Sequence, residues 1–299
     1  MTAAVAICHE SDQEWHVERA KGLGGSDAPQ VLGISPFGGP ARVAASKLGY
    51  HVEDAESELH EWGHYVEEPL IRRFYAETGI EGKRSGTLYR SADPATPWLQ
   101  ATIDGEIPGQ PGGIQCKLAV YSWDAWDEGV PEYVDAQVQH EMAVMGWDFV
   151  YVLALLRGYQ FRWKQVERRP AFLRDRLLPA EADFWARLQA GESIAPLGAP
   201  DREWEALKAR FPRPVVGKSV DLIGADWPGI VARWREAADR KTKHEKAAKE
   251  LRNQIIAAMG DAEFATLDDG TTLSAKVSER AEHMVSASTA RTLRLVGAK

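Results

Sequence analysis

The chain has 299 residues, of which 44% are hydrophobic and 27% are charged, and its formal net charge is −8. This composition is typical of a soluble globular protein with one large domain or two smaller ones, and the acidic balance argues against binding nucleic acid through overall positive charge. The sequence contains neither a run of 18 apolar residues nor the basic and apolar start of a signal peptide, so we expect a cytoplasmic protein without a membrane partner.

In the first half of the chain, apolar spacing and turn residues predict helices followed by short strands. Apolar residues recur at helical spacing from residue 56 to 78, and Gly79 supplies a stop signal. The glycines of GLGGSD, residues 22–27, predict a turn into a helix that begins at Ser26 or Asp27. Further helices are expected over residues 14–21 and 41–50, and strands within residues 87–91, 98–107 and 112–120.

The middle of the chain predicts a helix, two paired strands and another helix. Residues 149–158 form an apolar run bounded by glycines, which predicts a buried strand, and residues 161–168 are its expected partner strand. We expect the flanking helices over residues 133–145 and 169–191.

A proline- and glycine-rich stretch over residues 193–217 predicts a domain boundary. We therefore divide the chain into domains 1–212 and 213–299. The second domain is expected to contain a long charged helix over residues 228–259 and a few short strands between residues 263 and 295.

Cysteine and histidine spacing argues against several kinds of site. Cys8 and Cys116 lie far apart without a CxxC pattern, so neither a disulfide framework nor a structural zinc site is expected. The eight histidines form no HxH or Ser/His/Asp arrangement, and we reject a mechanism based on histidine. We therefore look for a site built on carboxylate, amide and lysine side chains.

Asp104, Gln115 and Lys117 form the strongest candidate constellation. If residues 112–120 are a strand, the two-residue alternation places Gln115 and Lys117 on one face and Cys116 on the other. Asp104 precedes a glycine at the expected end of a strand, so its carboxylate can meet the Lys117 ammonium at the sheet edge. Phosphodiester hydrolysis needs oxygen ligands for Mg²⁺ and a cation that offsets charge on the phosphate. On spacing alone, an ordinary turn and a solvated lysine remain the alternative.

Two predicted helices add polar side chains. Glu67 lies on the apolar face of the helix over residues 56–78, where a carboxylate needs a charged partner or a metal, whereas Glu68 is turned toward the exposed side. We favour Glu67 as a site residue over a structural ion pair.

In the helix over residues 133–145, Gln137 and Glu141 are one turn apart and either can face the site. Gln139 and His140 are expected at the surface.

Two further segments can bind phosphate groups. Arg19 and Ser26 flank the glycine turn, where a guanidinium, a hydroxyl and backbone N–H groups can form a pocket for a terminal phosphate. An ordinary turn with a serine cap is the alternative. Residues 157–176 contain seven basic side chains with interleaved aromatic residues, which suits either a DNA backbone or a solvated surface.

Five segments resemble the successive motifs of the YqaJ-like viral recombinase family, which includes the lambda-type exonuclease, and the resemblance spans roughly residues 15–175. In chain order the segments are RAKGLGGSDAPQVLGISPF, EWGHYVEEPLIRRFYAETG, LQATIDGEI, GIQCKLA and YVDAQVQHEMAVMG. The resemblance implies an α/β (α+β) fold with a PD-(D/E)XK, restriction-endonuclease-like core, in which helices flank a central mixed sheet. It also implies digestion of one strand of duplex DNA in the 5′ to 3′ direction, which leaves 3′ single-stranded tails for recombination, with Mg²⁺ as cofactor and Mn²⁺ as a substitute.

The motif match carries residue roles with it. It implies metal-site roles for Glu67, Asp104 and Gln115, a catalytic role for Lys117 and a supporting role for Gln137. Arg19 and Ser26 match positions that hold the 5′-phosphate. The resemblance further implies DNA ends as substrate, a ring-shaped homo-oligomer, commonly a trimer, a single-strand annealing protein as partner, and a phage or prophage protein in the bacterial cytoplasm.

Gln115 departs from the family pattern, which has Glu or Asp at this position. An amide oxygen coordinates a hard cation more weakly than a carboxylate does. Three accounts remain: an active natural variant, an inactivating substitution, and a homologue that binds DNA without cutting it. A structure-specific endonuclease of the same fold is a further alternative.

Overall fold

The computed structural model describes residues 4–8, 11–50, 57–120, 123–213, 215–216, 219, 221–223, 226–267 and 272–275. The chain divides into two compact units, Met1–Pro212 and Arg213–Lys299.

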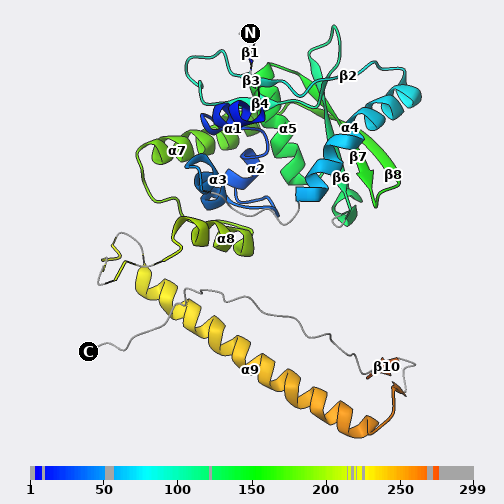
Figure 1. The fold of residues 1–299 in the computed structure, drawn as a ribbon, viewed down its shortest axis with the longest axis vertical. Helices are drawn as coiled ribbons and strands as arrows, with labels where there is room; N and C mark the ends of the chain where they lie inside the picture. Colours follow the sequence, from blue (N-terminus) through cyan, green and yellow to red (C-terminus); the bar gives the residue numbers. More distant parts are fainter. Residues whose placement is uncertain are drawn as a thin grey trace. The chain divides into compact units, whose positions relative to one another are not determined.

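A five-stranded mixed sheet forms the centre of the first unit (Figure 1). Its strands, in spatial order, are β2 (Lys83–Arg84), β5 (Gly105–Glu106), β6 (Gly112–Ala119), β7 (Phe149–Leu156) and β8 (Gln160–Glu167). β6 and β7 are parallel over their whole length, and the other neighbours are antiparallel. The expected buried strand and its partner are thus β7 and β8.

A smaller antiparallel sheet has the order β1-β3-β4, from β1 (Val5–Ile7), β3 (Leu88–Arg90) and β4 (Gln100–Thr102). The sequence predicted no strand at β1. It also predicted one extended segment over residues 98–107, whereas the structure places β4 in the small sheet and β5 in the large one. Asp104 lies at this crossing between sheets.

The helices of the first unit are α1 (Asp12–Ala20), α2 (Ala28–Val31), α3 (Pro40–Lys47), α4 (Ser57–Thr78), η1 (Trp123–Trp126), α5 (Glu132–Met145), α6 (Pro170–Phe172), the π-helical η2 (Leu173–Leu177), α7 (Leu178–Gln189) and α8 (Pro200–Arg210). α4 and α5 confirm two of the expected helices, and Gly79 ends α4 with a φ of +72°. α2 is only one turn long. α8 was not predicted, because it lies within the stretch whose prolines and glycines indicated a break.

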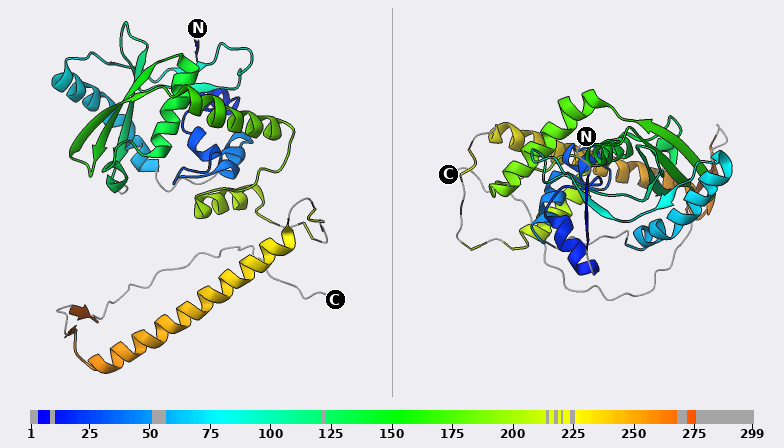
Figure 2. Two further views of the ribbon diagram at one scale, coloured as in Figure 1. Left: turned by 180° about the vertical axis from the view of Figure 1, so that it is seen from behind. Right: turned by 90° about the horizontal axis from the view of Figure 1, so that it is seen from above.

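Helices cover both faces of the large sheet (Figures 1 and 2). α4 packs against one face through Leu70 and Phe74, which share a cluster with Leu153 of β7. α5 packs against the other face, where Val138 meets Val152 of β7. The alternation of β7 therefore separates two apolar cores, and the predicted central mixed sheet flanked by helices is confirmed.

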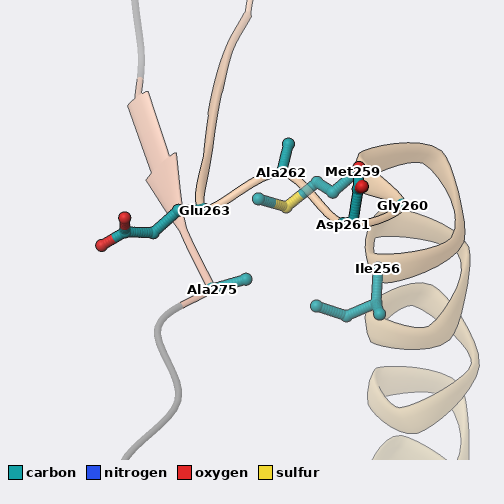
Figure 3. A pocket seen from close by; sticks show the side chains of 7 residues that line it. All are labelled: Ile256, Met259, Gly260, Asp261, Ala262, Glu263 and Ala275. Atoms are coloured by element: carbon teal, nitrogen blue, oxygen red, sulfur yellow. The ribbon is translucent and has the colours of Figure 1, made fainter.

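The second unit contains α9 (Trp227–Met259), a helix of 33 residues, and a hairpin of β9 (Phe264–Thr266) and β10 (Thr272–Ser274). The expected long charged helix is confirmed, and the two strands bear out part of the expected tail; residues 276–295 lie outside the described residues. Figure 3 shows Ile256 and Met259 pointing from the end of α9 toward Ala262 and Ala275 around an open hollow. Among the described residues, none of the helices combines the length and apolar character needed to cross a bilayer.

Candidate active site

Strand β6 brings Asp104 and Gln115 into direct contact. The alternation of the strand turns Ile114 and Cys116 into the core beneath α4, so that Gln115 and Lys117 face α5. The Oδ2 atom of Asp104 accepts hydrogen bonds from the Cys116 backbone N–H at 2.7 Å and from Gln115 Nε2 at 2.5 Å. Asp104 is therefore held at the side of β6, next to Gln115.

Lys117 is oriented by polar side chains of α5. Its Nζ atom donates a hydrogen bond to Gln137 Oε1 at 2.8 Å. The Nε2 atom of Gln137 in turn donates to Glu141 Oε1 at 2.9 Å. Both Gln137 and Glu141 thus face the site, and Glu141 is a buried site-facing residue to which the sequence assigned no role.

Burial raises the pKa of two carboxyl groups in this region. The pKa of Asp104 rises to about 6, because desolvation outweighs the opposing effect of the Lys117 ammonium and of the hydrogen bond from Cys116. The pKa of Glu141 rises to about 8, first through desolvation and then through the negative charge of Asp104. Ionising these buried carboxyl groups is costly unless a cation lies nearby. A bound cation would lower that cost, so the electrostatics of the site favour cation binding.

Glu67 and Glu68 take different sides of α4. Glu67 is 7% exposed, whereas Glu68 forms an ion pair with Arg72 at 2.9 Å near the surface. The Oε2 atom of Glu67 accepts from Arg84 Nε at 2.9 Å and Nη2 at 2.8 Å, and its Oε1 atom lies 2.8 Å from His64 Nδ1. Glu67 is therefore ion-paired, and its negative charge contributes to the raised pKa of Asp104. Arg84, in a two-residue strand, gave no signal in the sequence.

Arg19 and Ser26, the two residues predicted to bind a terminal phosphate, are in direct contact. Arg19, from the end of α1, donates through Nη2 to Ser26 Oγ at 2.6 Å. Lys47 of α3 reaches the same loop, where its Nζ atom lies 2.7 Å from Asp27 Oδ2. Asp27 also accepts from the Gly24 backbone N–H at 2.8 Å, and burial would raise its pKa, but Lys47 and Arg19 lower it below the usual value. The sequence missed Lys47, which lies 21 positions beyond Ser26 in another helix.

Gly25 connects these two groups of residues. A Cβ atom added to Gly25 would lie 2.7 Å from Glu141 Oε1, 3.0 Å from Glu141 Cγ and 3.2 Å from Gln137 Cγ. The loop that carries Ser26 therefore packs directly on the side chains that orient Lys117.

The oxygen atoms around Asp104 fit a hard cation. Gln115 Oε1 is buried and has no hydrogen-bond partner among the described residues, so it is an acceptor without a donor. Mg²⁺ prefers carboxylate and carbonyl oxygens, which Asp104 and Gln115 supply side by side. Across the residues that the structure describes, His, Cys, Asp and Glu form no preassembled group of three, so the fit rests on this mixed pair.

The expectation that Gln139 and His140 lie at the surface is wrong. Both are fully buried, because residues distant in sequence cover this side of α5. His140 Nδ1 lies 2.7 Å from Glu181 Oε1 of α7, and its Nε2 lies 2.8 Å from the Gln100 carbonyl oxygen. Burial alone would lower the pKa of His140, but the charge and hydrogen bond of Glu181 raise it to about 9.

The basic segment over residues 157–176 runs from β8 into the π-helical turn η2. Several of its side chains are engaged in ion pairs, including Arg169 with Asp135 and Arg176 with Glu132. Arg162 and Lys164 are exposed on β8. Only part of the predicted positive charge is thus available to a phosphate backbone.

A family model and a curated relative both relate this chain to YqaJ proteins. Residues 14–148 match the family described as the YqaJ-like viral recombinase domain. The chain is 31% identical over 259 residues to the protein YqaJ of Bacillus subtilis (strain 168), which covers 85% of this chain and 80% of that protein.

Among solved structures, similarity extends to the alkaline exonuclease LHK-Exo of Laribacter hongkongensis, with 19% identity, a TM-score of 0.49 and coverage of 60% of this chain and 93% of that one. The complex of LHK-Exo with dAMP gives 21% identity, a TM-score of 0.48 and the same coverage.

Proposed function

Because this chain belongs to the YqaJ-like viral recombinase family, we propose that it is a Mg²⁺-dependent exonuclease that digests one strand of duplex DNA from 5′ to 3′. The product would be a duplex with 3′ single-stranded tails, ready for recombination. The observation that carries the proposal is the convergence of Asp104, Gln115 and Lys117, with a buried amide oxygen that lacks a donor within the described chain.

Asp104 and Gln115 are the proposed ligands of Mg²⁺, and Mn²⁺ would serve in its place. Glu67 completes the proposed set, because a carboxylate has about four lone-pair sites and, among the described residues, Glu67 Oε1 has His64 Nδ1 as its one hydrogen-bond partner. The bound cation would supply Lewis-acid polarisation of the phosphate and a water of lowered pKa. Lys117, oriented by Gln137, would hold that water and offset the negative charge that develops on the phosphate.

Arg19 and Ser26 are the proposed binding residues for the 5′-phosphate of the DNA end. Their direct contact brings a guanidinium and a hydroxyl to one place, and the Lys47 ammonium lies in the same loop cluster. Guanidinium groups form strong charge-assisted hydrogen bonds with phosphate. Recognition of a terminal phosphate would restrict cutting to DNA ends.

The remaining features of the family are proposed for the whole chain. Residues 1–212 would form the nuclease domain, and the protein would act as a ring-shaped trimer around duplex DNA in the bacterial cytoplasm, together with a single-strand annealing protein. An acidic exterior with basic charge confined to the channel would reconcile DNA binding with the net charge of −8.

The proposal is tested by incubating the protein with linear duplexes that carry 5′-phosphate or 5′-hydroxyl ends, and with a closed circular duplex, in Mg²⁺ or in EDTA. We expect Mg²⁺-dependent release of nucleotides from the linear substrates, faster from the 5′-phosphate end. Cutting of the closed circle would instead support an endonuclease of the same fold.

Lys117→Ala tests the role of the lysine in the same assay. Loss of the cation next to the reacting phosphate should lower the rate by about 100-fold or more. Lys208→Ala, on the exposed side of α8, is the matched control and should leave the rate unchanged. An unchanged rate in Lys117→Ala would overturn the proposed site.

One observation favours a second function, a DNA-binding recombination protein with a weakened site. The Gln115 amide donates a hydrogen bond to Asp104. The family pattern has an acid at position 115, which would add a second negative charge there. In that case the chain would bind linear duplex without Mg²⁺-dependent release of nucleotides.

A further inference from the structure

Glu141 is a buried carboxyl group for which the proposed reaction has no role. It is 2% exposed and lies in the middle of α5, one turn after Gln137. Burying a carboxyl group is costly unless hydrogen bonds compensate for the lost water. The geometry around Glu141 therefore calls for a functional explanation.

The contacts of Glu141 determine which way the Gln137 amide points. A glutamine side chain has a donor end and an acceptor end, and either end can face a neighbour. Because Glu141 Oε1 accepts from Gln137 Nε2 at 2.9 Å, the Gln137 oxygen is left facing Lys117 Nζ at 2.8 Å. With the amide turned around, its NH₂ group would face the ammonium, and two donors would oppose each other.

Gly25 fixes the position of Glu141 from the other side. The space for a side chain at Gly25 is already filled by Glu141 and Gln137. Its neighbour Gly24 differs, because a Cβ atom there would make only ordinary contacts, at 3.7 Å from Asp27 and 3.8 Å from Arg19. Of these two neighbouring glycines, Gly25 is the one that lies against Glu141.

We propose that Glu141 is a positioning residue that fixes the Gln137 amide, and through it the Lys117 ammonium, and that Gly25 couples this chain of hydrogen bonds to the loop of Arg19 and Ser26. The effect on cleavage rests on the proposed function. The chain of hydrogen bonds itself is measurable in the protein without DNA or metal, so a failure of the nuclease proposal and a failure of this one are distinguishable.

The first test follows the side-chain amide of Gln137 by NMR in the full-length protein labelled with [¹⁵N]glutamine. Its signals are identified as those lost in Gln137→Met. In Glu141→Met, which keeps the volume and removes the acceptor, we expect the Gln137 amide protons to exchange with solvent at least about tenfold faster. Glu141→Gln retains an acceptor oxygen and should restore slow exchange.

Asp135→Asn is the matched control on the same helix. Asp135 accepts from Gln139 Nε2 at 3.3 Å, which is the same carboxyl and amide pairing one turn apart. This variant should leave the Gln137 signals and the cleavage rate unchanged. Slow exchange of the Gln137 amide in a folded Glu141→Met protein would overturn the proposal.

The second test uses the loop, and it remains decisive even if Glu141→Met does not fold. Gly25→Ala must displace Glu141, so the Gln137 amide protons should exchange with solvent faster than in the wild-type protein and their signals should move, whereas Gly24→Ala should leave both unchanged. Equal spectra for the two alanine variants would contradict the coupling.

A kinetic measurement distinguishes a positioning role for Glu141 from a role in binding DNA. In the wild-type background, Glu141→Met and Gly25→Ala should each lower kcat by about tenfold while KM for the linear duplex stays within about twofold, because the lysine is misplaced and the DNA contacts remain. A change confined to KM would assign Glu141 to substrate binding and overturn its positioning role.

Discussion

Gln115 places an amide where a carboxylate would add a second negative charge beside Asp104. The contact of 2.5 Å between Gln115 Nε2 and Asp104 Oδ2 is a hydrogen bond only because one partner is neutral and donates. Asp104 already has its pKa raised to about 6 by burial. The neutral amide therefore adds no second negative charge beside Asp104, whereas a Glu at this position would place two acidic groups in contact.

The variant Gln115→Glu should bind Mg²⁺ more tightly, because a carboxylate is the stronger ligand for a hard cation. We expect affinity to rise about tenfold, measured by titration calorimetry, and the cleavage rate at low Mg²⁺ to rise with it. Equal affinity and an equal rate in the two proteins would show that the amide serves as well as the acid.

The buried pair of His140 and Glu181 makes stability depend on pH. The pKa of His140 is raised to about 9 in the folded protein and is near 6.5 when the chain is unfolded. The contribution of this protonated histidine is therefore complete below pH 6.5 and is lost as the pH rises through about 9.

His140→Gln should accordingly cost more stability at pH 6 than at pH 9.5, by on the order of 3 kcal/mol. Urea unfolding of both proteins at the two pH values measures the difference. His244→Gln, exposed on α9, serves as the control and should show no such difference. A penalty for His140→Gln that is the same at both pH values would mean that His140 is neutral in the fold.

Residue-level prediction succeeded where the cause is local and failed where it is distant. The shared face of Gln115 and Lys117 follows from the two-residue period of one strand, and the inward turn of Glu67 follows from the helical period of α4. The burial of His140 depends on Glu181, 41 positions away, and no pattern within α5 indicates it.

Among the elements, α8 holds the start of α3 in place through one side chain. Glu203 Oε1 accepts from the backbone N–H groups of Gly39 at 3.0 Å and Arg42 at 2.9 Å, and its Oε2 accepts from those of Ala41 at 3.0 Å and Leu197 at 3.2 Å. The first N–H groups of a helix lack acceptors within the helix, and here the carboxylate of a glutamate from another helix accepts their hydrogen bonds.

Glu203→Ala should destabilise the protein by about 2–4 kcal/mol, since three buried or part-buried N–H groups lose their acceptor and that of Arg42 keeps only the Gly39 carbonyl oxygen. Urea unfolding gives the value. Glu205→Ala, two positions along the same helix and more exposed, should cost less than about 1 kcal/mol. A similar loss in both variants would mean that the cap contributes little.

Element boundaries were predictable where a stop signal coincided with an apolar period. α4 and its terminal Gly79 are such a case. α8 was missed because Pro200 and the glycines before it indicate a break, although proline is favoured in the first turn of a helix. The split of residues 98–107 between two sheets was also missed, because strand pairing depends on partners elsewhere in the chain.

On the scale of the whole molecule, the buried apolar residues of the described ranges all lie before residue 213, the last of them being Ala206 of α8. Within the described chain, α9 contributes no buried residue. A protein shortened to residues 1–212 should therefore keep its Tm within about 4 °C of the full chain. A drop of more than about 10 °C in a thermal melt would show that the second unit supports the first.

The parallel pairing of β6 and β7 also sets an order in time. From Gln115 onward, β6 has β7 as its paired strand, and β7 ends at Leu156, well after the last polar residue of the site. A chain growing on the ribosome thus contains Asp104, Lys117 and Glu141 before the strand that aligns them is complete. During synthesis, these site residues are therefore in the chain before β7, the strand that pairs with β6, is available.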